Sequence, residues 1–158
     1  MQKKIPIDRN NRDASKPVES NGQFITVFTD ASHCPNTNAY GIGVWIKHSD
    51  GKIITLSTGG IGLKDSTQAE YAGINYALNY IKANLDSRGK ILVLQCDSIA
   101  ALEKLDQFCV KVRLQLKFLK LKHVKGHTNA RSNRTRVNAI VDRLAGEQMR
   151  KFRARAKK

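Results

Sequence analysis

The sequence predicts an α/β fold in which helices flank a mixed five-stranded sheet. Three observations lead to this fold class. Three strand-like segments follow one another, joined by turn residues, and later strand-like segments alternate with amphipathic helical segments. The length of 158 residues, 41% of them hydrophobic, fits a single domain with a substantial core. The predicted order is β-β-β-α-β-α-β-α, with three antiparallel strands followed by two parallel ones.

The predicted strands of the first half lie at residues 23–30, 39–48 and 52–58. They are rich in β-branched and aromatic side chains, which favour strands. Residues 49–51, Ser-Asp-Gly, supply a tight hairpin turn between the second and third strands. In the first strand, alternation with a period of two places four side chains on one face: Phe24, Thr26, Phe28 and Asp30.

The second half alternates helices with strands. Asp65, Ser66 and Thr67 offer helix caps before a segment with apolar residues at helical spacing. A short continuous apolar run then has the pattern of a central parallel strand covered on both sides. The predicted segments are a helix at 68–83, a strand at 90–97, a helix at 98–108, an edge-like strand at 117–124 and a helix at 135–152. Residues 109–116 fit either a short helix or a loop.

The domain is predicted to span residues 23–152. Residues 1–22 are polar and lack any regular period, so we expect a disordered extension, and residues 153–158 form a basic tail. The start of the chain lacks the apolar stretch of a secretory signal, and no segment is long and apolar enough to cross a bilayer. These features predict a cytoplasmic protein.

The charge predicts a polyanionic partner. Lys and Arg total 28 against 13 Asp and Glu, a formal net charge of +15, and residues 107–141 contain no acidic residue at all. Such an uneven excess points most often to nucleic acid; general solubility and a ribosomal-type packing protein are the alternatives. The three cysteines have no paired spacing, which argues against a disulfide framework and against a zinc knuckle.

Four acidic residues lie beside apolar segments of the sequence. Asp30 and Asp97 close strand-like runs, and Glu70 and Asp142 lie in helix-like stretches. A carboxylate beside a core is costly unless it is paired or binds a metal. Any one of them alone could be a helix cap or a salt-bridge partner. Together they predict one cluster that binds hard cations through oxygen.

These acids lie in motifs that together resemble type 1 ribonuclease H. The resemblance covers residues 24–149, and the motifs occur in the family's order on the expected elements. They are Thr29-Asp30-Ala31-Ser32, Gly41-Ile42-Gly43-Val44-Trp45, Gln68-Ala69-Glu70, Gln95-Cys96-Asp97-Ser98, His123-Val124-Lys125-Gly126-His127-Thr128 and residues 138–145 around Asp142. The resemblance implies an endonuclease that hydrolyses the RNA strand of RNA–DNA hybrids by a two-metal-ion mechanism and leaves 5′-phosphate products.

The resemblance also implies a role for each residue. Asp30 would bridge two Mg²⁺ ions, for which Mn²⁺ is a possible substitute. Glu70 would hold one ion and orient the attacking water, Asp97 would complete that side, and Asp142 would hold the other ion. His127 matches a loop histidine that assists proton transfer or product release.

The chain departs from the family pattern in its substrate-binding segments. The stretch between Asp97 and His127 has no room for the basic helical handle that many members use to grip the hybrid, and the loop from His127 to Asp142 is longer than usual. Basic residues in 111–136 and 150–158 are candidates to replace that grip. The candidate nucleic-acid contacts are Ala31, Ser32, Cys34, Gln68, Lys125, Arg131, Arg134 and Arg136.

Two other functions remain open from the sequence. The same fold could act on double-stranded RNA or DNA junctions, because fold alone does not determine substrate. The chain could also be a nucleic-acid-binding module with weak or no turnover, although the complete set of acids argues against this. We expect a monomer, with membership of a larger replication or reverse-transcription assembly as an alternative.

Overall fold

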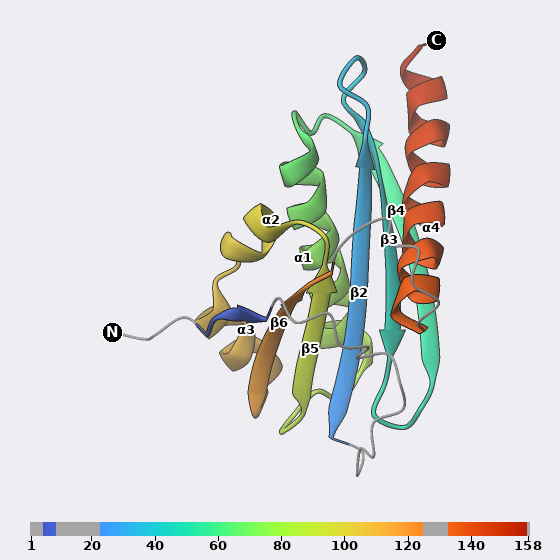
Figure 1. Ribbon diagram of the computed structural model, residues 1–158. Coiled ribbons are helices and arrows are strands. Elements are labelled where there is room, and N and C mark those ends of the chain that lie inside the picture. The colour runs from blue at the N-terminus through green and yellow to red at the C-terminus, as the bar shows by residue number, and fades with distance from the viewer. Residues whose placement is uncertain (1–4, 9–22, 125–132, 158) are drawn as a thin grey trace.

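The computed structural model describes residues 5–8, 23–124 and 133–157. A single sheet has the strand order β1-β6-β5-β2-β3-β4 (Figure 1). Strands β2, β3 and β4 are antiparallel neighbours, and β5, β6 and β1 run parallel to β2. The mixed sheet predicted from the sequence is therefore confirmed. The strands are β1 Ile7–Asp8, β2 Phe24–His33, β3 Ala39–Lys47, β4 Ile53–Ile61, β5 Ile91–Cys96 and β6 Phe118–His123.

Within the described part of the chain the sheet has six strands, so the prediction of five was wrong. The additional strand, β1, lies within the predicted N-terminal extension and pairs in parallel with β6, with Ile7 opposite Leu121. The prediction that β6 forms the sheet edge was therefore also wrong. Two residues are too few to show a period of two, and β1 is held by tertiary contacts: the amide of Ile5 donates to Gln107 Oε1 (2.7 Å), and Asp8 pairs with Lys120 (3.4 Å).

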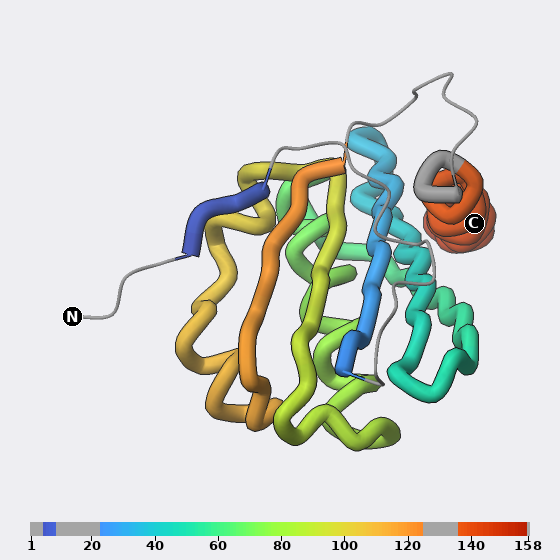
Figure 2. Tube along the Cα trace, turned by 60° about the horizontal axis from the view of Figure 1, so that its bottom comes forward, coloured from blue at the N-terminus to red at the C-terminus, as the bar shows by residue number. Residues whose placement is uncertain are grey.

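Helices cover both faces of the sheet. The helices are α1 Ser66–Asn84, α2 Ile99–Glu103, α3 Gln107–Leu114 and α4 Asn133–Ala156. Buried residues of α1, α2 and α3 join one large core cluster with inward side chains such as Val27. Val137 and Val141 of α4 join a smaller cluster with Phe28 and Trp45 on the opposite face. Viewed along its axis, α4 lies apart from the other helices (Figure 2).

Caps and breaks in the helices explain where the predicted boundaries differ. The Asp65 carboxylate accepts from the amide of Gln68 (2.8 Å) and starts α1, as predicted. The helix predicted at 98–108 is two helices, because Asp106 caps a new start by accepting from the Cys109 amide (3.0 Å). Residues 109–114, ambiguous from the sequence, belong to α3. The last helix continues to Ala156, four residues into the predicted tail.

In the described part of the chain, none of the helices combines the length and apolar composition that crossing a membrane requires.

Two glycines of β3 let α4 approach the sheet closely. A Cβ atom on Gly43 would lie 2.2 Å from the carbonyl oxygen of Val141, and one on Gly41 would lie 2.0 Å from that of Ala145. Because these neighbours are backbone atoms, a larger residue would push the helix away. Gly43 is also the register partner of Asp30 in β2. The glycines therefore fix the helix segment 141–145 beside one of the predicted site residues.

One buried amide predicts a gain in stability. Gln95 in β5 is fully buried, and neither polar atom of its side chain has a hydrogen-bond partner among the described residues. We expect Gln95→Met, which conserves the volume, to raise the free energy of unfolding by about 1–2 kcal/mol, because an unsatisfied buried amide is removed. Chemical denaturation measures this change. The matched control is Gln148→Met, whose amide donates to Ser57 Oγ (3.3 Å) and whose replacement should bring no gain. Equal effects of the two substitutions would contradict this account.

Candidate active site

The candidate site forms around Asp30 near the end of β2. Its side chain is almost completely buried, with 4% exposure. The amide of Ala31 donates to Asp30 Oδ1 (2.8 Å) and also to Glu70 Oε1 (3.2 Å). One backbone amide therefore holds carboxylates from two different elements side by side.

Helix α1 supplies Glu70, which is 8% exposed. The helix packs directly on the sheet at Gly73, where an added Cβ would lie 3.4 Å from Ile42 and 3.9 Å from the carbonyl oxygen of Asp30. Glu70 lies one turn before this contact, so its side chain points along the sheet surface toward Asp30. The small residues on this face of α1 thus bring the glutamate to the end of β2.

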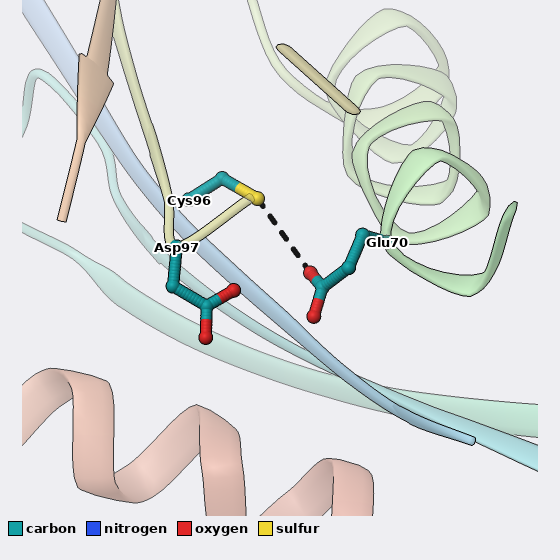
Figure 3. A group of neighbouring side chains, drawn as sticks. All are labelled: Glu70, Cys96 and Asp97. Atoms are coloured by element: carbon teal, nitrogen blue, oxygen red, sulfur yellow. Dashed lines mark hydrogen bonds between the residues drawn. The ribbon is translucent and has the colours of Figure 1, made fainter. Parts of the chain in front are cut away.

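Asp97 directly follows β5, the strand that pairs in parallel with β2. The carboxyl groups of Asp97 and Glu70 point into the same space (Figure 3). Potential ligand atoms of Glu70, Cys96 and Asp97 all lie within 4.8 Å of one another. The backbone oxygen of Asp97 lies 3.1 Å from His123 Nε2, so this histidine of β6 contacts the backbone that carries Asp97.

Helix α4 brings Asp142 to the other side of the cluster. Asp142 follows Val141, whose backbone contacts the position of Gly43, opposite Asp30. Unlike Asp30 and Glu70, it is exposed. Its charge nevertheless raises the pKa of both Asp30 and Asp97. The four acids predicted from the sequence therefore come together from four separate elements.

Burial and mutual repulsion disfavour the ionised forms of these acids. Burial, with a smaller contribution from the Asp97 charge, raises the pKa of Asp30 to about 7. Burial followed by the charges of Asp97 and Asp30 raises the pKa of Glu70 to about 10. Burial also raises the pKa of Asp97. A divalent cation among these oxygens would remove the repulsion, and carboxylates are ligands that Mg²⁺ and Mn²⁺ prefer. The donor set therefore fits a hard divalent metal.

Comparison with solved structures identifies the fold. The chain is similar to LC11-RNase H1, isolated from compost by a metagenomic approach and solved in complex with an RNA/DNA hybrid, with a TM-score of 0.62, 21% sequence identity, and coverage of 80% of this chain and 97% of that one. It is also similar to the N-terminal RNase H domain of Rv2228c from Mycobacterium tuberculosis (TM-score 0.60, 20% identity, 85% and 99% coverage). A third similar structure is RNase H1 from Halobacterium salinarum (TM-score 0.53, 19% identity, 81% and 98% coverage).

The chain has a type 1 ribonuclease H-like fold. This confirms the resemblance inferred from the sequence motifs at the level of the fold. No protein-family model matches the sequence, and no curated protein is similar enough to it to count as a match.

Sequence reasoning did not assign Cys96 to the candidate site. Cys96 is buried at the end of β5, and its Sγ donates to Glu70 Oε2 (3.5 Å; Figure 3). Burial and the Glu70 charge raise its pKa, which keeps it a neutral thiol and hence a donor. The only sequence signal was its position beside Asp97, since the contact with Glu70 arises from the packing of α1 on the sheet.

The predicted nucleic-acid contacts have varied surroundings. The Ala31 amide is engaged by the two carboxylates, and that of Cys34 donates to the carbonyl of Ala39 (2.8 Å). The Gln68 side chain accepts from the Lys64 amide (2.9 Å) and lines an open groove of about 610 Å³ on α1. Ser32 is half-buried and Arg136 is exposed. Three other predicted site residues, His127, Lys125 and Arg131, lie outside the described residues, as does the side chain of Arg134.

Proposed function

We propose that this protein is a metal-dependent endoribonuclease that hydrolyses the RNA strand of RNA–DNA hybrids. The observation that carries the proposal is the convergence of four carboxylates, two of them buried, in a chain with a formal net charge of +15. A basic surface attracts a polyanion, whereas a local acidic cluster repels one unless cations lie between. The structure of LC11-RNase H1 with an RNA/DNA hybrid supports this choice of substrate.

In this proposal Asp30, Glu70, Asp97 and Asp142 hold two Mg²⁺ ions. When bound, the ions supply a hydroxide nucleophile and neutralise the charge that develops on the phosphate and on the leaving oxygen. The protein orients the ligands before the substrate arrives. The Ala31 amide fixes the oxygens of Asp30 and Glu70, and the Cys96 thiol fixes the other oxygen of Glu70.

Substrate selection in this proposal depends on shape and on sugar hydroxyls. RNA is distinguished from DNA by its 2′-hydroxyls, which a protein reaches across a wide, shallow minor groove without reading base edges. Gln68 lies on α1 with Glu70, Ser32 lies on β2 with Asp30, and Cys34 directly follows β2. They remain our candidates for these contacts, with His127 assisting proton transfer or product release. We expect little sequence preference and strong dependence of binding on salt.

A cleavage assay on matched duplexes tests the proposal. Uniformly labelled hybrid, double-stranded RNA and double-stranded DNA of one sequence are incubated with the protein in Mg²⁺ or in EDTA. We expect cleavage of the RNA strand of the hybrid in Mg²⁺ alone, with 5′-phosphate ends, and its loss in Asp97→Asn while hybrid binding persists. Cleavage of the RNA duplex in preference to the hybrid would assign the same site to another substrate. Cleavage that survives both EDTA and Asp97→Asn would contradict the proposed site.

A further inference from the structure

Helix α4 contains a glycine that packing against the sheet does not explain. A glycine inside a helix costs about 1 kcal/mol relative to alanine. At Gly41, Gly43 and Gly59, an added Cβ would meet backbone atoms of another element. At Gly146 the three nearest atoms all belong to the Arg150 guanidinium: Nη1 at 3.0 Å, and Cζ and Nη2 at 3.7 Å. The missing side chain therefore makes room for Arg150.

This contact directs Arg150 toward the carboxylate cluster. Side chains on a helix point toward its N-terminus, and the guanidinium lies over a residue one turn before its own Cα. Gly146 is itself one turn after Asp142, about 6 Å along the helix axis. The Arg150 guanidinium therefore lies over Gly146, one helical turn from Asp142 of the candidate site.

Arg150 is also available for a ligand. Among the described residues it is exposed and forms no ion pair. Two other cations of the same helix are arranged differently: Lys151 Nζ and Arg155 Cζ lie 5.9 and 5.0 Å from the centre of the Phe152 ring. Phe152 in turn covers Gly59 of β4. Of these three cations, Arg150 is the one whose guanidinium lies over Gly146, one turn of the helix after Asp142.

We propose that Arg150, positioned by Gly146, binds a backbone phosphate of the nucleic acid next to the phosphate held at the four-carboxylate site. A guanidinium is planar, always charged and able to hold two phosphate oxygens at once, which suits this role. The inference rests on the proposed function, because it requires a nucleic-acid strand across the carboxylates. Arg150 is a substrate-binding residue, and Gly146 is a positioning residue that acts through it.

The test exploits the opposite effects that Gly146→Ala should have on stability and on binding. Alanine favours the helix, so the melting temperature should rise by a few degrees. Its Cβ would lie 3.0 Å from Nη1, so the guanidinium must shift by a few tenths of an ångström, and KM for the hybrid should rise severalfold while kcat changes less than about twofold. Arg150→Ala should raise KM roughly tenfold and reduce the slope of log K against log salt by about 1. The double variant should be no weaker than Arg150→Ala, since both changes remove one contact.

Binding is measured separately from cleavage by placing each substitution in the Asp97→Asn protein and titrating hybrid over a range of salt concentrations. Arg155→Ala is the matched control, because it removes one positive charge from the same helix away from Gly146. Equal weakening by Arg155→Ala and Arg150→Ala, or unchanged KM in Gly146→Ala, would overturn the inference while hybrid cleavage by the unsubstituted protein leaves the proposed function intact. Failure of the unsubstituted protein to bind or cleave any duplex would instead refute the proposed function, and this inference with it.

Discussion

Glu70→Gln should reduce the cleavage of RNA–DNA hybrid by about 10³-fold, the loss typical when one electrostatic group at a reacting phosphate or carbonyl is removed. The substitution conserves shape but removes the negative charge that a divalent cation needs. It also leaves the Ala31 amide an oxygen to bond. We therefore expect kcat to decrease, because the glutamine side chain preserves the local structure while the negative charge that would bind the metal is removed.

The matched control is Glu103→Gln, which removes an exposed carboxylate at the end of α2. Glu103→Gln changes the net charge by the same amount as Glu70→Gln, so both variants share any general effect of charge on the attraction of the substrate. The activity of Glu103→Gln should stay within about twofold of that of the unsubstituted protein. Initial rates over a range of hybrid and Mg²⁺ concentrations give kcat and KM for both variants. Comparable activity in Glu70→Gln and Glu103→Gln would remove Glu70 from the catalytic site.

The parts of this site that the sequence predicted depend on local patterns. Asp30 closes the apolar run of β2, a strand that continues to His33, and Asp97 directly follows β5. Parallel pairing of the two strands places both acids toward one edge of the sheet. The sequence also predicted the strand at 39–48 that contains Gly41 and Gly43, but not that these glycines allow α4 to approach. Where the prediction succeeded, a short run of residues was sufficient, because strand alternation is visible in neighbouring positions.

The features that the sequence did not predict depend on contacts between distant residues. Strand β1 forms because Ile7 and Asp8 pair with β6, which lies more than a hundred residues away in the sequence. Two residues show no alternation of apolar and polar side chains that could have predicted the strand. The bond between Cys96 and Glu70 requires the exact height of α1 over the sheet. The place of Gly146 under Arg150 requires a side-chain rotamer, whereas the sequence shows only a glycine and an arginine four residues apart.

The pH dependence of stability should reveal the acid cluster in the metal-free protein. Asp30 has a pKa of about 7 in the folded state against an ordinary value of 3.8. Between these values the folded state binds more protons than the unfolded state, so the free energy of unfolding falls as pH rises from about 4 to about 7. Glu70, with a pKa of about 10 against 4.5, extends the same decline to higher pH. Its contribution is complete below the ordinary value and is lost as pH rises through the folded value.

A divalent cation should reverse this decline, because it binds the ionised carboxylates of the folded state. At a concentration a hundred times its dissociation constant, such a ligand adds about 2.7 kcal/mol to the free energy of unfolding. Thermal unfolding in EDTA and in Mg²⁺ or Mn²⁺ at several pH values measures both effects. The stabilisation by metal should grow from pH 5 to pH 8 and be accompanied by proton release, since the protons of Asp30 and Glu70 must leave before the cation enters. In Glu70→Gln the decline above pH 7 should be weaker than in Glu103→Gln. A metal-free stability that is equally independent of pH in both variants would mean that the carboxylates repel one another too little to require a cation.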